Sequence, residues 1–189
     1  MILDIGPGCS DIASYLIEFC EARNHTLILI DSSEMLSLLP DSSHLRKVPA
    51  HFPDCPDLLA ELKNRVDVIL CYSVFHYIFR EVNIFEFLDK SLSLLAPKGQ
   101  FLIGDIPNIS MRKRFFSSES GIAFHKSFMN TDQPPKTVFN TIEPDSIDDS
   151  VIFSLLNRSR LSGFNAFVLP QPDSLPMSNR REDILIIKP

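Results

Sequence analysis

Short apolar runs alternate with amphipathic stretches along most of the chain. The runs at residues 2–6, 26–31 and 66–71 are dominated by leucine, isoleucine and valine and have the length of buried strands. The stretches between them place apolar side chains three and four positions apart, which is the spacing of a helix with one buried face. We expect strands at residues 2–6, 26–31, 45–49, 66–71, 100–106, 164–169 and 183–188. We expect helices at residues 11–23, 33–39, 57–65, 84–95 and 145–162.

This alternation predicts an α/β fold whose mostly parallel, seven-stranded sheet is covered by helices on both faces. A chain of 189 residues is long enough for one domain with its own core, so we expect a single domain over residues 1–189. One stripe of the helix at residues 11–23 is apolar, and we expect it to face the sheet. The side chains of that stripe are Ile12, Leu16, Phe19 and Cys20.

Residues 107–144 interrupt the alternation. The stretch is rich in serine, proline and phenylalanine. Because a structureless loop of this size is uncommon in a compact domain, we expect an insertion with some helix that covers the acceptor site of an enzyme. Its basic side chains could hold an anionic, partly apolar or sugar-phosphate substrate, or they could form a solvated helix face. These side chains are Arg112, Lys113, Arg114 and Lys126.

Composition excludes several classes of partner. The net charge of −6 argues against non-specific nucleic-acid binding, which needs a basic surface. No apolar run approaches the roughly 20 residues of a membrane span, and no signal peptide is visible, so we expect a cytoplasmic protein without a membrane partner. The four cysteines form no CxxC pair, which favours reduced thiols over disulfides or a metal site. The oligomeric state stays open.

The first strand runs directly into a glycine turn. Gly6 and Gly8 let the backbone approach a ligand where a Cβ atom would collide. Asp31 ends the second strand, 23 positions after Gly8, which is about the distance at which an acidic residue reaches ribose hydroxyls in such folds. Together these features predict half of a nucleotide-type binding site.

The residue after this turn narrows the ligand. A dinucleotide fingerprint would have its third glycine at position 11, where this chain has Asp11. A carboxylate near the helix N-terminus repels the pyrophosphate that a dinucleotide places there. No Gly-Lys-Ser/Thr follows the turn, which excludes a P-loop. The turn therefore favours a nucleoside ligand without a phosphate at this position.

Six segments, in order along the chain, resemble the motifs of class I S-adenosylmethionine-dependent methyltransferases. Residues 3–8 (Leu-Asp-Ile-Gly-Pro-Gly) look like the glycine motif, and Asp31 looks like the ribose-binding acid. The other four segments are 49–53 at the adenine, 67–77 at the fourth strand, 94–101 leading into the fifth strand, and 155–156 with 162–164 at the end of the last helix. The resemblance implies a Rossmann-like fold with an antiparallel last strand and S-adenosylmethionine as the cofactor.

The resemblance also implies roles for individual residues. Gly6, Pro7 and Gly8 would pass under the methionyl part of the ligand, and Asp4 would offset the charge of its ammonium group. Asp31 would bind the ribose, although it could instead cap the turn at Ser32 and Ser33. Further cofactor residues would be Ser32 after the second strand, Ala50, His51 and Phe52 along the adenine, and Cys71 and Ser73 at the end of the fourth strand. Plain core packing is the alternative for Cys71.

Methyl transfer needs little acid–base help, because the sulfonium is already activated and alignment does most of the work. An oxygen acceptor still benefits from a base. His76 follows the fourth strand at the carboxyl edge, where open-sheet sites form, and its pKa range suits proton removal. Asp105 on the fifth strand is a second candidate, as a base or as an anchor for the acceptor. Packing on the next helix, for His76, and hydrogen bonding in a loop, for Asp105, are the alternatives.

The chain departs from the family pattern in two places. Ser10 stands where the family often has a third glycine. Met1 directly precedes the first strand, so the N-terminal helices that commonly cover the cofactor in the family do not precede the turn, which predicts weak or no cofactor binding by this form. We expect S-adenosylmethionine-dependent methyl transfer to a small molecule, such as a carbohydrate-linked or other biosynthetic intermediate. A non-catalytic binding domain and a nicotinamide-dependent oxidoreductase are the alternatives.

Overall fold

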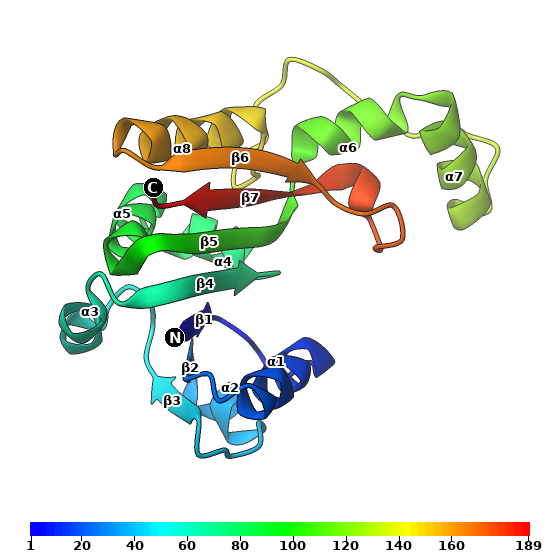
Figure 1. Cartoon of the computed structure of the whole chain (residues 1–189). Helices are drawn as coiled ribbons and strands as arrows, with labels where there is room; N and C mark the ends of the chain where they lie inside the picture. Colours follow the sequence, from blue (N-terminus) through cyan, green and yellow to red (C-terminus); the bar gives the residue numbers. More distant parts are fainter.

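One seven-stranded sheet forms the centre of the molecule. In the computed structural model, which describes residues 1–189, the strands lie in the order β3-β2-β1-β4-β5-β7-β6 (Figure 1). Only β7, the last strand in the sequence, runs antiparallel to its neighbours, as predicted. The strands are β1 (Ile2–Ile5), β2 (Leu27–Asp31), β3 (Leu45–Pro49), β4 (Val66–Tyr72), β5 (Leu95–Pro107), β6 (Asn165–Pro170) and β7 (Arg181–Ile187).

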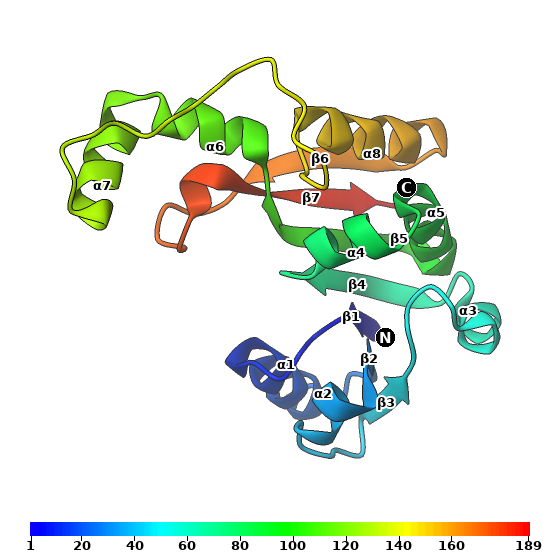
Figure 2. The same ribbon diagram turned by 180° about the vertical axis from the view of Figure 1, so that it is seen from behind.

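Helices cover both faces of the sheet. Leu27 and Leu29 of β2 pack with α1 and α2, whereas Ile28 and Ile30 of the same strand join the larger core on the other face. Helices α4 and α5 lie behind β5 in Figure 1 and in front of it in Figure 2. None of the helices is both long and apolar enough to cross a bilayer. They are α1 (Asp11–Ala22), α2 (Ser33–Ser37), α3 (Pro56–Leu62), α4 (Phe75–Glu81), α5 (Ile84–Leu94), α6 (Ile109–Phe116), α7 (Glu119–Met129) and α8 (Asp149–Leu161), with a 3₁₀ turn, η1 (Ser178–Arg180).

The order of the predicted elements is correct, but several of them differ in extent. Helix α3 ends at Leu62 rather than at 65, and β5 begins at Leu95 rather than at 100 because Leu95 already pairs with Val66 before a bulge. Helix α4 was not predicted. It is short, and the side chain of Val74 at its N-cap position makes no capping hydrogen bond, so it lacks the usual start signal.

The predicted inward stripe of α1 is only half correct, since Cys20 is buried and Leu16 packs against the same core. The helix buries Ala13, Ile17 and Cys20 against the sheet. Ile12 and Phe19 are instead exposed, and the Phe19 ring lies 4.0 Å from the guanidinium of Arg23 on the surface. The inward face is thus centred on residues 13, 17 and 20, and the predicted stripe overlaps it at Leu16 and Cys20.

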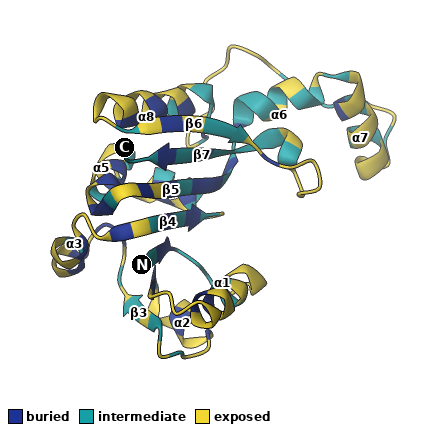
Figure 3. Cartoon of the chain, in the orientation of Figure 1, coloured by how far each residue is buried: buried dark blue, intermediate teal, exposed yellow.

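Two helices, α6 and α7, occupy much of the segment 107–144. Both project beyond the sheet on the side of the carboxyl ends of β4 and β5 (Figures 1 and 2). Helix α6 contains no buried residue, and it stands out from the dark core of the sheet in Figure 3. The position of this segment therefore depends on polar contacts at its root rather than on an apolar interface.

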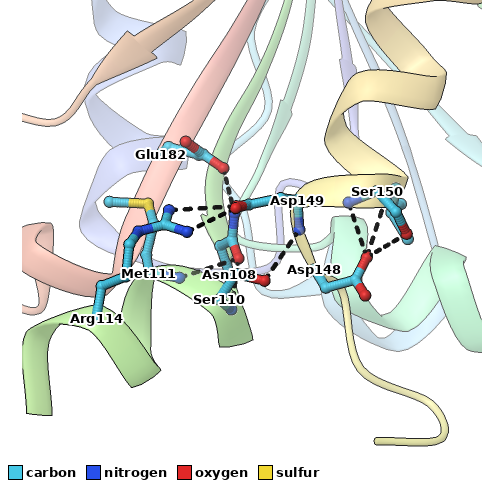
Figure 4. Close-up of polar contacts among 9 residues, drawn as sticks. Asn108, Ser110, Met111, Arg114, Asp148, Asp149, Ser150 and Glu182 are labelled. Atoms are coloured by element: carbon cyan, nitrogen blue, oxygen red, sulfur yellow. Dashed lines mark hydrogen bonds and ion pairs between the residues drawn. The ribbon is translucent and has the colours of Figure 1, made fainter. Parts of the chain in front are cut away.

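Asn108 provides that root (Figure 4). Its Oδ1 accepts hydrogen bonds from the first amides of α6, and its Nδ2 donates to Asp149 of α8 at 2.8 Å and to Glu182 of β7 at 2.6 Å. Arg114 of α6 donates to the same Asp149 carboxylate at 2.6 Å. One buried amide thus joins three elements and fixes where α6 leaves the sheet.

All four cysteines are free thiols, as predicted. Cys20, Cys55 and Cys71 are buried, and Cys9 is exposed beside the glycine turn. Burial raises the pKa of the Cys20, Cys55 and Cys71 thiols, so all three are uncharged packing groups at neutral pH.

Candidate functional site

A cleft of about 450 Å³ opens at the carboxyl ends of β1, β2 and β3, and we call it the cofactor cleft. It lies beside the point where the strand order reverses, between β1 and β4. Ligands bind at this switch point in open α/β sheets. Helix α4 forms its opposite wall. Six of the predicted cofactor residues line it: Gly6, Asp31, Ser32, Ala50, His51 and Phe52.

The glycine turn forms the floor of the cofactor cleft. Gly6 has φ +70°, and a Cβ atom there would lie 2.7 Å from Cγ2 of Val74, so any side chain would push Val74 into the cleft. Gly8 has φ +62° with open space around it, and its amide donates to Oδ2 of Asp31 at 2.9 Å. Pro7 and Gly8 belong to the turn but do not line the cleft.

Asp31 is held in place by backbone amides. Its Oδ2 accepts from Gly8, and its Oδ1 accepts from the amide of Ser32 at 2.7 Å. Each carboxylate oxygen can accept a further hydrogen bond, so the side chain is oriented but still able to receive two hydroxyl groups. Ser32 caps α2, because its hydroxyl accepts from the amide of Met35. Asp31 thus holds the turn at Ser32, the alternative that the sequence left open, and its ribose role stays a prediction.

Asp4 lies beneath the turn rather than in the cleft wall. Its side chain is only 5% exposed and makes no hydrogen bond. Burial, helped by the neighbouring Asp31 carboxylate, raises its pKa to about 7. Asp4 is thus a carboxyl group that a nearby cation would convert to the charged form.

The far wall of the cleft follows β3. Phe52 is buried and packs edge-on against Phe87 at 5.5 Å between ring centroids, which gives the cleft an apolar base. His51 lies at the mouth, with its Nε2 3.7 Å from the Glu81 carboxylate. Sequence reasoning missed Glu34, Tyr77 and Glu81, which also line the cleft. Tyr77 and Glu81 could not be found because α4 was not predicted.

Two predicted cofactor residues of β4 do not reach the cleft. Cys71 is completely buried in the core. Ser73 has φ +59°, its amide donates to the carbonyl of Gly104, and its hydroxyl donates to Asp105. The turn after β4 is thus tied to β5, and a ligand role for Cys71 and Ser73 stays a prediction.

The two candidate catalytic residues lie on the other side of α4. His76 lines a second hollow together with Arg80 and Arg181. Burial lowers the pKa of His76, and the positive charges of Arg181 and Arg80 lower it further, so its imidazole is neutral at pH 7. The Nδ1 atom of His76 is buried and has no hydrogen-bond partner.

Asp105 makes several hydrogen bonds and one ion pair. Its carboxylate pairs with Arg181 and accepts from Ser73 and from Nε2 of Gln171. Its amide donates to Asp183 at 2.8 Å, which holds the residue at φ +58°. A carboxylate with three donors, one of them a guanidinium, is better suited to an anchor than to a base.

No protein-family model matches the sequence, and neither does any curated protein. Solved structures do match. The plantazolicin methyltransferase BpumL in complex with S-adenosylhomocysteine aligns with 99% of this chain and 75% of its own, at a TM-score of 0.62 and 15% identity. An S-adenosylmethionine-dependent methyltransferase from Aquifex aeolicus aligns with 98% of this chain and 80% of its own, at a TM-score of 0.57 and 14% identity.

A third match is an O-methyltransferase family 2 protein from Planctomyces limnophilus in complex with apigenin, at a TM-score of 0.57 and 14% identity. It aligns over this entire chain, which spans only 50% of its length, and a matched protein from Nostoc punctiforme is likewise covered over 51% of its length. At such identities the matches define the fold. The chain has the Rossmann-like fold of class I S-adenosylmethionine-dependent methyltransferases.

Proposed function

We propose that this protein binds S-adenosylmethionine in the cofactor cleft and transfers its methyl group to a small-molecule acceptor. The observation that carries the proposal is the meeting of Gly6, Asp31 and the segment 50–52 in one cleft beside the switch point of the sheet. The fold supports the same reading, since similar structures include one with S-adenosylhomocysteine and one with apigenin bound.

The chain's own residues would hold the ligand by complementary chemistry. The amide-oriented carboxylate of Asp31 accepts hydrogen bonds from a ribose, and Ala50 and Phe52 offer apolar surface to a base. Asp4 beneath the turn would become charged opposite an ammonium group. When bound, S-adenosylmethionine supplies a methyl group already activated on a sulfonium, so the protein need only align the acceptor.

His76 is the candidate base for an oxygen or nitrogen acceptor. Because its imidazole is neutral at pH 7, it can accept a proton without first losing one. His76 lines the hollow on the other side of α4 from the cofactor cleft, and we expect the acceptor to enter from that side. Asp105, paired with Arg181, would act as the anchor of that region.

Calorimetric titration with S-adenosylhomocysteine and, separately, with NAD tests the proposal. We expect weak but saturable binding of S-adenosylhomocysteine and none of NAD. Asp31→Asn removes the charged acceptor and should weaken S-adenosylhomocysteine about tenfold or more, because a hydrogen bond to a charged group contributes roughly 1.5–3 kcal/mol.

Asp57→Asn is the matched control. Asp57 is an exposed carboxylate in the first turn of α3, away from the cleft, so this variant should bind like the wild type. Absence of S-adenosylhomocysteine binding by the wild type, or equal affinity in Asp31→Asn, would contradict the proposal. Preferential binding of NAD would point to an oxidoreductase.

A further inference from the structure

Four arginine side chains converge on one hollow of about 260 Å³, which we call the arginine pocket. They come from four separate elements: Arg80 from α4, Arg112 from α6, Arg180 from η1 and Arg181 from the start of β7. The fold, rather than a local run of basic sequence, therefore assembles this concentration of positive charge.

The arginine pocket and the cofactor cleft lie on opposite sides of α4. Tyr77 and Glu81 of that helix face the cofactor cleft. His76 and Arg80, four positions apart and so on one helix face, line the arginine pocket. The two hollows are thus separated by one short helix at the same edge of the sheet.

Three of the four guanidinium groups have no carboxylate partner. Arg181 is paired with Asp105, but Arg80, Arg112 and Arg180 form no ion pair. Asp145 is the one acidic side chain that lines the pocket, and Arg80 donates to its backbone carbonyl rather than to its carboxylate. This is unusual in a chain with 24 acidic and 18 basic side chains, where acids are in excess.

Other basic side chains, unlike these three arginines, are paired with carboxylates. Arg114 is on the same helix as Arg112 and is paired with Asp149, and Arg158 is paired with Asp89. Lys113 is paired with Glu143. Of the basic run at residues 112–114, only Arg112 is thus left free to bind something else.

One aromatic ring, that of Phe116, lies near two of the three unpaired guanidinium groups. The Phe116 ring lies 5.8 Å from the guanidinium carbon of Arg112 and 5.6 Å from that of Arg180. Burial lowers the pKa of Arg180, and the charges of Arg112 and Arg181 lower it further, which reports mutual repulsion in the unliganded protein. An anion placed among these groups would relieve that repulsion and find their donors already oriented.

We propose that the arginine pocket binds an oxyanion, a carboxylate or a phosphate, carried by the methyl acceptor. This inference rests on the proposed function, because it assigns the acceptor's chemical class. The planar forks of Arg112 and Arg180 match two oxygens of such a group. His76 lines the same pocket, so an acceptor anchored there lies beside a neutral imidazole.

Titrations with inorganic phosphate and with acetate, at fixed ionic strength, test the proposal on the complete chain. We expect saturable binding of at least one anion by the wild type, and about tenfold weaker binding by Arg112→Gln and by Arg180→Gln. Arg23→Gln, which removes an exposed arginine on the far side of the turn, should bind like the wild type. Tighter binding of phosphate would identify a phosphate-bearing acceptor, and tighter binding of acetate a carboxylate.

The proposal is overturned if the wild type saturates with neither anion, or if the two pocket variants bind as tightly as Arg23→Gln. Loss of fold cannot imitate the expected result, because removing one of several repelling charges should leave the thermal midpoint without anion unchanged or raised. S-adenosylhomocysteine titrated into the same variants separates the two proposals. If S-adenosylhomocysteine does not bind but anions bind in an arginine-dependent way, the methyltransferase function alone is refuted. If S-adenosylhomocysteine binds but no anion does, the arginine pocket alone is refuted.

Discussion

Two carboxyl groups in the glycine-turn region have opposite environments. Asp31 at the edge of the cleft is held by two amides, whereas Asp4 below it is buried without a hydrogen bond. A buried carboxyl with no donor costs stability whenever it is charged. Such a cost is tolerated at binding sites, where a ligand can offset it, and Asp4 is therefore the residue whose charge state should respond most to binding.

The folding stability should show the cost of Asp4 directly. Its pKa is 3.8 in the unfolded chain and about 7 in the folded protein, so between these pH values the unfolded chain ionises while the folded protein keeps the proton. The folded protein therefore has its full stability from Asp4 below pH 4 and loses it as the pH rises to 7. Asp4→Asn cannot ionise and escapes this loss. Relative to wild type, the variant should gain about 4 kcal/mol between pH 4 and pH 8 in urea unfolding, since the pKa differs by about three units between the two states and each unit corresponds to about 1.4 kcal/mol.

The comparison must be made as a difference between the two proteins, because other groups titrate in the same range. If the stability difference between Asp4→Asn and wild type is constant from pH 4 to pH 8, the raised pKa of Asp4 is wrong. Asp57→Asn supplies the reference for removing an exposed carboxylate, and its difference from wild type should not depend on pH in this way.

At the scale of elements, polar contacts of Asn108 hold the start of the segment 107–144, which would cover an acceptor. Asn108 is 1% exposed, and it links the start of α6 to α8 and to β7 (Figure 4). The pKa of Glu182 is raised by burial, and the hydrogen bond from Asn108 opposes that shift. Loss of the amide would leave the Glu182 carboxylate without this donor.

Asn108→Ala should therefore lower the free energy of unfolding by about 2–4 kcal/mol, since it removes a helix cap and the donor that the half-buried carboxylates of Asp149 and Glu182 share. Asn157→Ala is the control, because Asn157 is exposed on α8 and should change stability by less than about 0.5 kcal/mol. Urea unfolding measures both. A loss for Asn108→Ala no larger than that for Asn157→Ala would mean that other contacts position α6.

Sequence reasoning succeeded for elements that periodicity defines and failed for elements that tertiary contacts define. Buried strands and the amphipathic α5 were predicted because their apolar patterns are strong. Helix α4 was missed because it is seven residues long and lacks a capping side chain. For α1, periodicity predicted a stripe that shares Leu16 and Cys20 with the buried face but also includes the exposed Ile12 and Phe19.

For the whole molecule, local signals in the sequence were enough to predict the kind of sheet. The alternation of strands and helices predicted a mostly parallel sheet, and the resemblance to the methyltransferases added the antiparallel last strand, whereas the order of the strands in the sheet was not predicted. The cofactor cleft followed because carboxyl ends of adjacent parallel strands meet at one edge. The arginine pocket did not follow, because its four arginines come from residues 80 to 181 and meet only once the chain is folded.

A structure of the protein with S-adenosylhomocysteine bound tests the central claim most directly. We predict the ribose hydroxyls on the Asp31 carboxylate, the adenine along Ala50 to Phe52, and the sulfur directed past α4 toward His76. A nucleoside bound anywhere other than the cofactor cleft, or a ribose that does not contact Asp31, would contradict the account.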